Sequence, residues 1–148
     1  MQQLNFPTYN FKLNHAGKKT QIFDVIRKKY VVLTPEEWVR QHLVMFLVRE
    51  KKYPASLIAV EISLNRGSKK QRADIVAYSN SGKPFLIAEC KAPEVKITQE
   101  TFFQIARYNA PLKMDYLFVT NGINHYCCKM DYQNGEHKFL EEIPLFLL

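Results

Sequence analysis

Two apolar segments separated by a short polar turn constrain the fold of this chain more than any other feature. Residues 72–78 and 85–91 are rich in Val, Ile, Phe and Ala, and Ser, Asn and Gly lie between them, which is the pattern of a β-hairpin. A turn centred on Ser81–Gly82 pairs residues that lie equally far from it along the chain. The register then predicts three cross-strand pairs: Tyr78 with Phe85, Val76 with Ile87, and Asp74 with Glu89.

Asp74 and Glu89 stand out in this hairpin because both are acids in otherwise apolar strands. Cross-strand neighbours have Cβ atoms ~4.5–5.5 Å apart, and two carboxylates at that separation repel unless a cation or a shared proton lies between them. Magnesium binds one or two carboxylates together with waters and phosphate oxygens. The pattern therefore predicts a Mg²⁺ site, with Mn²⁺ as a substitute, in which Asp74 and Glu89 are metal ligands.

Cys90 and Lys91 follow Glu89 directly. Because side chains alternate across a strand, Lys91 shares the face of Glu89, whereas the side chain of Cys90 points to the opposite face. We expect Lys91 to orient or deprotonate an attacking water, or to offset charge on a phosphate. The backbone carbonyl of Cys90 is a further candidate metal ligand, and its side chain is expected to be structural. The alternative interpretation is a structural ion cluster at a sheet edge.

The clearest helix start lies at Thr34-Pro35-Glu36-Glu37, with an N-cap threonine, a proline at the first helical position and a glutamate three residues after the cap. At about 100° per residue, Glu36 lies on the apolar stripe of the helix with Arg40 beside it, and Glu37 lies off that stripe. We therefore expect Glu36 to approach the metal site and Glu37 to complete a capping box with Thr34. A partner of the helix dipole is the alternative role for Glu36.

The other elements complete a mixed α/β (α+β) pattern. In chain order they are a β-rich entry over residues 1–33, a strand over 57–64, a helix after Thr98 that carries Gln104 and Tyr108, a strand over 115–120, and a terminal hairpin around Gln133-Asn134-Gly135. The 148 residues are the usual size of one domain, so we expect a single domain over 1–148.

Composition narrows the partners of this domain. The formal net charge is +7, which favours a polyanion such as DNA, and Lys69, Lys70 and Arg72 lie just before Asp74, where we expect them to contact phosphate. The sequence has no apolar run of the ~20 residues that a membrane span needs. The start of the chain has no signal-peptide pattern, and the three cysteines make an odd count. These features predict a cytoplasmic protein without a membrane partner.

The chain also resembles a known family. Residues 72–76 followed by 87–93 resemble the PD-(D/E)XK nuclease core, and more closely the nuclease domain at the N-terminus of type I restriction enzyme R subunits. Further matches are the run 34–41, the spacing of Gln104 and Tyr108, and the strand end 119–122. The resemblance covers about residues 20–125. The family fold is a central mixed sheet flanked by helices in the order αβββαβ, a restriction-endonuclease-like core.

The resemblance implies Mg²⁺-dependent hydrolysis of DNA phosphodiester bonds. Carried over to this sequence, Asp74 and Glu89 are metal ligands, Lys91 is the catalytic lysine and Glu36 is an accessory acid. In the family this acid precedes an arginine by four residues, which fits Glu36 and Arg40. Three side chains are then expected at the nucleic acid or near the lysine: Gln104, Tyr108 and Arg40.

The chain departs from R subunits in one respect: it has no GxxxxGK[S/T] phosphate loop, so this polypeptide has no ATP site and no translocating motor of its own. We therefore expect a stand-alone DNA endonuclease, or a nuclease subunit that works with targeting or motor subunits in trans. Cutting both strands favours a homodimer. The alternative is a catalytically silent DNA-binding or assembly module that kept the nuclease fold.

Overall fold

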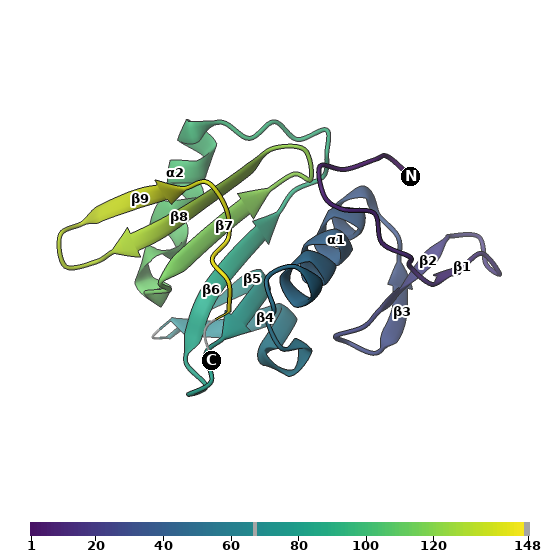
Figure 1. The fold of residues 1–148 in the computed structure, drawn as a ribbon, viewed down its shortest axis with the longest axis horizontal. Coiled ribbons are helices and arrows are strands. Elements are labelled where there is room, and N and C mark those ends of the chain that lie inside the picture. Colours follow the sequence, from purple (N-terminus) through teal and green to yellow (C-terminus); the bar gives the residue numbers. More distant parts are fainter. Residues whose placement is uncertain (67, 147–148) are drawn as a thin grey trace.

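The computed structural model describes residues 1–66 and 68–146, and the side chains of Arg66 and Lys69 lie outside that description. In these residues two α-helices accompany two β-sheets (Figure 1). In chain order the elements are β1 (Leu13–Asn14), β2 (Gln21–Asp24), β3 (Lys29–Val32), α1 (Pro35–Arg49), the 3-10 turn Ala55–Leu57, β4 (Ile58–Arg66), β5 (Lys69–Tyr78), β6 (Pro84–Cys90), α2 (Gln99–Asn109), the 3-10 turn Ala110–Leu112, β7 (Tyr116–Thr120), β8 (His125–Asp131) and β9 (Glu136–Leu140).

The larger sheet has the strand order β4-β5-β6-β7-β8-β9. All neighbouring strands run antiparallel except β6 and β7, which are parallel and are joined through α2. A parallel neighbour requires such a crossover, because a tight hairpin reverses the chain. The predicted mixed α+β class is therefore confirmed, and so is the β-rich entry, in which β1, β2 and β3 form a small sheet of their own.

Both helices begin at the predicted threonines. The Oγ1 atom of Thr34 accepts a hydrogen bond from the amide of Glu37 at 3.0 Å, and Pro35 is the first helical residue of α1. In the same way Thr98 accepts from the amide of Thr101 at 3.1 Å at the start of α2. Neither helix in the described part of the chain has the length and apolar character that crossing a membrane requires.

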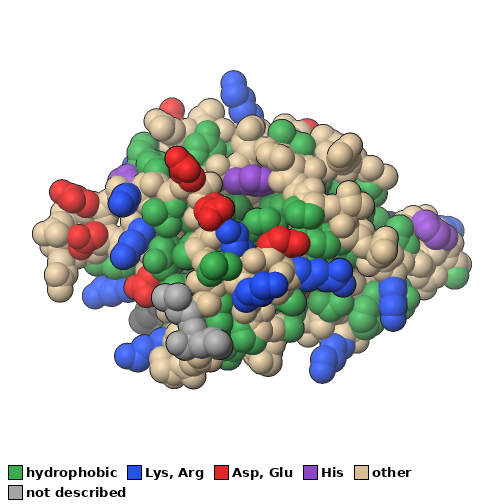
Figure 2. Space-filling view, in the orientation of Figure 1, with side chains coloured by type: hydrophobic (Ala, Val, Ile, Leu, Met, Phe, Trp, Pro, Cys, Tyr) green, Lys and Arg blue, Asp and Glu red, His purple; other side chains and the backbone are tan. Residues whose placement is uncertain are grey.

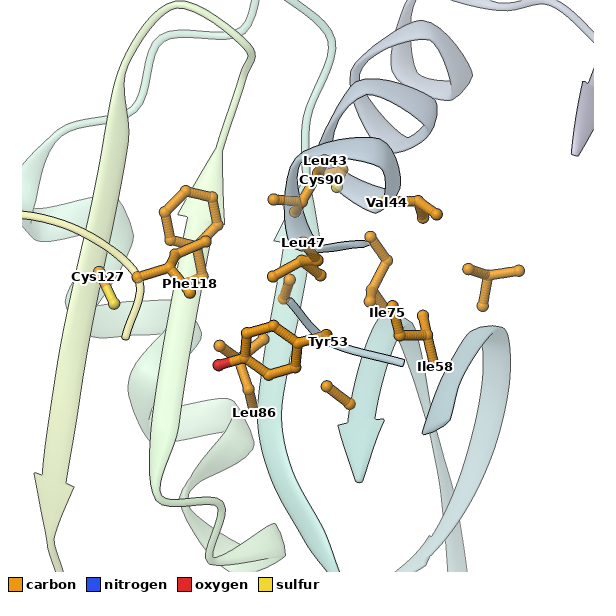
Figure 3. Packing of buried hydrophobic residues seen from close by; sticks show 14 of the residues in the cluster. Leu43, Val44, Leu47, Tyr53, Ile58, Ile75, Leu86, Cys90, Phe118 and Cys127 are labelled. Carbon is orange, nitrogen blue, oxygen red and sulfur yellow. The ribbon is translucent and has the colours of Figure 1, made fainter. Parts of the chain in front are cut away.

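The two helices cover opposite faces of the larger sheet, α1 in front and α2 behind in the view of Figure 1. The α1 face buries the larger cluster, part of which Figure 3 shows. Its helix and sheet members include Leu43, Val44 and Leu47 from α1, Ile75 and Ala77 from β5, and Leu86, Ala88 and Cys90 from β6. The α2 face buries a second cluster that includes Phe102, Ala106, Val76, Ile87 and Val119.

The central hairpin keeps the predicted register near the acids and loses it near the turn. Val76 pairs with Ile87 as predicted. Tyr78 pairs with Pro84 and not with Phe85, because the register shifts between Ala77 and Tyr78. The extra residue of such an irregularity breaks the alternation of side chains. Phe85 accordingly packs with the α1-side cluster, although Ile87 belongs to the α2 side.

The preceding hairpin is longer than the sequence pattern suggested. The polar, basic segment 65–70 was expected to be a link between strands, but Asn65 pairs with Lys70 and Arg66 pairs with Lys69. Polar side chains do not prevent pairing here, because β4 is the edge strand of the sheet and its outer side faces solvent.

Gly122 occupies a position that suits no other residue well. Its φ of 88° is strained for residues with a side chain, and a Cβ there would lie 2.8 Å from Leu4 Cδ2 and 3.1 Å from Val39 Cγ2. We expect Gly122→Ala to lower the free energy of unfolding by about 2–4 kcal/mol, from backbone strain and overpacking together. Gly135→Ala is the control, since φ there is 64° but none of the described residues lies within 4 Å of the added Cβ. Urea denaturation of both variants measures the difference, and equal losses would contradict the packing role.

Candidate active site

Asp74 lies on β5 beside the end of β6. One of its oxygens, Oδ2, accepts a hydrogen bond from the backbone amide of Cys90 at 2.7 Å. The other, Oδ1, lies 3.3 Å from Nη2 of Arg40 on α1. The neighbouring pair of Ile75 with Ala88 continues the predicted register toward Glu89. The structure thus brings Asp74 to the end of β6, where Glu89 and Lys91 lie.

The backbone around Asp74 is irregular, which lets its side chain leave the strict alternation of the strand. Ala73 belongs to the α2-side cluster and Ile75 to the α1-side cluster, although residues two apart on a regular strand share a face. On the neighbouring strand, Val60 pairs with Ile75, and the next residue, Glu61, has a φ of 48°. The irregularity places Asp74 between the two faces, so that it reaches both Arg40 and the amide of Cys90.

Arg40 lies at the centre of the acidic residues. Its side chain is only 4% exposed, and its guanidinium lies within ion-pairing distance of four carboxylates. The distances are 2.9 Å to Glu37, 3.3 Å to Glu61, 3.3 Å to Asp74 and 3.6 Å to Glu36. The family resemblance placed Arg40 at the nucleic acid, but its burial among acids leaves it no surface for a phosphate. The structure gives Arg40 a different role, which is to hold the carboxylates in place.

A second arginine connects this cluster to the small N-terminal sheet. Arg27, in the turn between β2 and β3, lies 2.6 Å from Asp24, 2.8 Å from Glu37 and 3.3 Å from Glu61. Asp24 is fully buried, and the amides of Ile26 and Arg27 also donate to it, which lowers its pKa despite the opposing effect of burial. The chain of charges therefore runs from the small sheet through α1 to Asp74.

Glu89 has the most perturbed carboxyl group of the site. Burial is the largest cause, followed by the charge of Asp74 and a hydrogen bond with it, and together they raise the pKa of Glu89 to about 8. Lys91 acts in the opposite direction, and Glu36 adds a smaller increase. A carboxyl that keeps its proton because another acid lies beside it is a frequent feature of functional sites.

The two glutamates of the first turn of α1 differ from prediction in which of them is buried. Glu37 is the buried one, and its carboxylate contacts Arg27, Arg40 and the side-chain amide of Gln41. Its amide completes the cap with Thr34, but its side chain turns inward and does not reach back to the cap. The side chain of Glu36 is 47% exposed, so its assignment to the core-facing stripe was wrong.

Glu36 nevertheless lies near the other acids. Partial burial and the charge of Asp74 raise its pKa, while Arg40 and Lys91 lower it. It is therefore a half-exposed acid at the rim of the cluster. The side chain of Cys90 is buried in the α1-side cluster, as predicted for a structural residue (Figure 3).

Some of the residues expected to contact the nucleic acid line a cavity beside the acids, and others lie outside it. A cavity of about 250 Å³ lies beside the acids, and its lining includes Arg72, Glu89, Lys91, Gln104 and Tyr108. Helix α2 thus presents Gln104 and Tyr108, which are both exposed, next to Glu89 and Lys91. Lys70 is exposed but outside this cavity, and the side chain of Lys69 lies outside the described residues.

Three charged residues of the cluster were not predicted from the sequence: Glu61, Arg27 and Asp24. Glu61 was accessible to the same counting that predicts the pair of Asp74 with Glu89, because the paired residues of β4 and β5 lie equally far from the last pair, Arg66 with Lys69. The polar composition of 65–70 indicated a link and so concealed this pairing. Arg27 and Asp24 carry no sequence signal of their function, since their contacts to α1 arise only when the small sheet packs on the helix.

The donor set is compatible with a hard divalent cation but does not enclose one. Across residues 1–66 and 68–146, no group of three or more His, Cys, Asp or Glu side chains is placed to hold a metal ion. Mg²⁺ commonly takes only one or two carboxylates and completes its shell with waters and substrate oxygens. The pair Asp74 and Glu89 offers such carboxylates, and a cation would relieve the repulsion that raises the pKa of Glu89.

Comparison with known proteins shows which family this chain belongs to. Residues 35–144 match the family described as the N terminus of the type I restriction enzyme R protein. This chain belongs to that family. It is also similar in fold to a solved fragment assigned to an HsdR subunit of a type I restriction enzyme from Vibrio vulnificus, with a TM-score of 0.52 and 20% identity over 76% of this chain and 24% of that chain. The present chain thus spans about a quarter of the length of that fragment. No curated protein matches the present chain.

The raised pKa of Glu89 leads to a pH prediction for the metal-free protein. Between the ordinary pKa of 4.5 and about 8, the native state holds a proton that the unfolded chain has lost. The free energy of unfolding therefore falls as pH rises through this window, by at most about 1.4 kcal/mol per pH unit. Glu89→Gln removes this group, so its unfolding free energy should fall less between pH 5 and 8 than that of wild type. Urea denaturation in EDTA measures both slopes, and identical slopes would refute the shift.

Arg40→Met tests the central ion cluster. Removing the guanidinium leaves Glu37 buried without its closest cation on the same helix, which we expect to lower the free energy of unfolding by about 3–5 kcal/mol. Arg72→Met is the control, because Arg72 is 70% exposed and, within the described part of the chain, forms an ion pair with Glu61 alone, at 3.4 Å; we expect its loss to cost about 0–1 kcal/mol. If both variants lose equal stability in chemical denaturation, Arg40 is not the centre of the cluster.

Proposed function

We propose that this chain is a Mg²⁺-dependent DNA endonuclease with a PD-(D/E)XK, restriction-endonuclease-like core and a single nuclease domain over residues 1–148. The observation that carries the proposal is the pair of interacting acids, Asp74 and Glu89, beside Lys91 in a member of the R-protein N-terminal family. Two carboxylates and a lysine next to an open cavity are the groups that metal-assisted hydrolysis of a phosphodiester requires.

In this proposal Asp74 and Glu89 hold the metal, with the backbone carbonyl of Cys90 as a further ligand and Glu36 as an accessory acid at the rim. A Mg²⁺ ion bound there supplies Lewis-acid polarisation of the phosphate and a more acidic water. The protein fixes the ligand geometry: Arg40 and the amide of Cys90 each engage one oxygen of Asp74, which limits the rotation of this carboxylate.

Lys91 is the residue that acts on the reacting groups. The pKa values of Glu89 and Glu36 are both raised, and the positive charge of Lys91 opposes the rise in each case. The ammonium group of Lys91 therefore lies near both carboxyl groups. From this position it can orient the attacking water or stabilise negative charge that develops on the phosphate. Its backbone amide donates to the carbonyl of Thr120 on β7 at 2.8 Å, which fixes the chain just beyond β6.

In this proposal DNA approaches the acids through the cavity between β5 and α2. Arg72 is a candidate for a phosphate contact at its rim, and Gln104 and Tyr108 for contacts to the backbone or to Lys91. Lys70, which is exposed on β5, is a further candidate for a phosphate contact, as is Lys69 by its place in the sequence. Because one site cuts one strand at a time, we propose that two copies act together, or that targeting and motor subunits in trans complete the enzyme.

A plasmid-cleavage assay tests this function. We expect wild type to nick or cut plasmid DNA with Mg²⁺ or Mn²⁺ and to leave it intact in EDTA. Lys91→Ala should reduce the rate by about 10²–10³-fold, as the loss of a charge-stabilising group does in other enzymes. Lys83→Ala, an exposed lysine in the turn before β6, is the matched control and should cut at the wild-type rate. Equal cleavage by Lys91→Ala, or no cleavage by wild type, would refute the proposal.

A further inference from the structure

The N-terminal segment that forms the small sheet accounts for most of the net positive charge of the chain. Residues 1–33 contain six Lys and Arg residues and one acid, which gives +5 of the net charge of +7. The matched family region begins at residue 35, after this sheet. Five exposed lysines lie on β3 and the connecting turns or next to β1: Lys12, Lys18, Lys19, Lys28 and Lys29.

The single acid of this segment does not offset that charge at the surface. Asp24 is fully buried and paired with Arg27 at 2.6 Å, and Arg27 itself turns inward to Glu37. Among the described residues, none of the five lysines forms an ion pair. On the face seen in Figure 2, the end of the molecule formed by β1–β3 shows basic side chains and no acidic ones.

The two faces of this sheet differ. Ile22 and Asp24 on β2 are fully buried, so their face points into the molecule. Phe23 lies on the opposite face, and its cross-strand partner is Tyr30 on β3. The two rings pack edge to face with centroids 5.3 Å apart, and Tyr30 remains 41% exposed. Lys12 places its Nζ 5.7 Å from the centre of the Phe23 ring, so a cation lies beside the aromatic pair.

An exposed aromatic ring on a sheet, with unpaired lysines on the same element, is an arrangement that suits single-stranded nucleic acid. Bases stack on the ring without regard to sequence, and the cations neutralise the phosphates on either side. A duplex keeps its bases stacked inside, so it would use the lysines but not Tyr30. The aromatic face therefore favours a single strand over a duplex.

We propose that the outer face of the β1–β3 sheet binds a single-stranded segment of DNA, with a base stacked on Tyr30 and phosphates on Lys12 and on the lysines of the adjoining turns. The opposite, inward face of the sheet contacts α1 through Arg27 and Glu37, so the outer face is free of that contact. This binding does not require cleavage and stands whether or not the site hydrolyses DNA.

Fluorescence anisotropy in EDTA tests the proposal on the full chain. The probes are a labelled oligothymidine of about 16 nucleotides, the length of a larger single-strand site, and the same strand in a duplex with oligoadenine. We expect the single strand to bind more tightly than the duplex, and the reverse order would overturn the proposal. EDTA prevents metal-dependent cleavage, so a protein that fails the plasmid assay can still pass this one.

Substitution of Tyr30 tests the stacking. Tyr30→Ala should weaken binding of the single strand by about 5–100-fold, the range found when one stacked base loses its aromatic partner, and should leave the duplex nearly unchanged. Tyr30→Phe keeps the ring and should bind as wild type does. Loss of binding in both variants, or in neither, would overturn the stacking role. Circular dichroism of each variant reports whether the sheet is intact.

Substitution of the lysines tests the phosphate contacts without touching the aromatic pair. Changing Lys18, Lys19, Lys28 and Lys29 together to Gln should reduce the dependence of log Kd on log salt by about 0.7 for each phosphate that the protein no longer neutralises, as for other single strands. The control changes four exposed lysines elsewhere to Gln and so removes the same charge: Lys83, Lys113, Lys129 and Lys138. Equal effects of the two sets would show that only net charge matters and would overturn the assignment to the β1–β3 sheet.

Discussion

The site depends on one buried cation. Arg40 is 4% exposed and lies within 3.6 Å of carboxylates from α1, β4 and β5. Without this charge the acids would repel one another in a region of low dielectric, and α1 would not pack against the sheet at this point. The guanidinium has several donors in a plane, so one side chain can hold carboxylates that come from separate elements. Arg40 therefore links α1 to the carboxylates of β4 and β5, in addition to the apolar contacts of the helix with the sheet.

Much of the sequence-based prediction rested on local rules, and these parts were confirmed. The caps at Thr34 and Thr98 are decided by a few neighbouring residues and appear as predicted. The register next to Asp74 follows from matching apolar residues on two strands, because a slip by one residue would turn their side chains to the wrong faces. The same rule failed at Phe85, where a shift in pairing near the turn puts an extra residue into one strand.

The roles within α1 could not be predicted, because they depend on partners from distant segments. Glu36 and Glu37 are adjacent, and periodicity assigned the wrong one to the interior. Burial of Glu37 is favourable only because Arg27, from the turn after β2, and Arg40 both reach it. No window around α1 contains Arg27, so a calculation of apolar stripes treats Glu37 as a residue that belongs in water. The closeness of Asp74 and Glu89 was accessible from the sequence, whereas the arginines that hold the surrounding carboxylates were not.

The distribution of charge over the molecule follows from the same arginines. Arg27 and Arg40 pair with acids inside the protein, so they add little to the electrostatic potential at the surface. Asp24 adds little for the same reason, because it is buried and paired with Arg27. The remaining exposed acids at the site, chiefly Glu36 and Glu61, would repel the phosphates of a nucleic acid at close range. The lysines of the β1–β3 sheet lie on the neighbouring element and attract the same polymer. Burying the arginines with the acids, and leaving the lysines in solvent, thus lets one small chain combine an acidic cluster with a basic surface that a polyanion can approach.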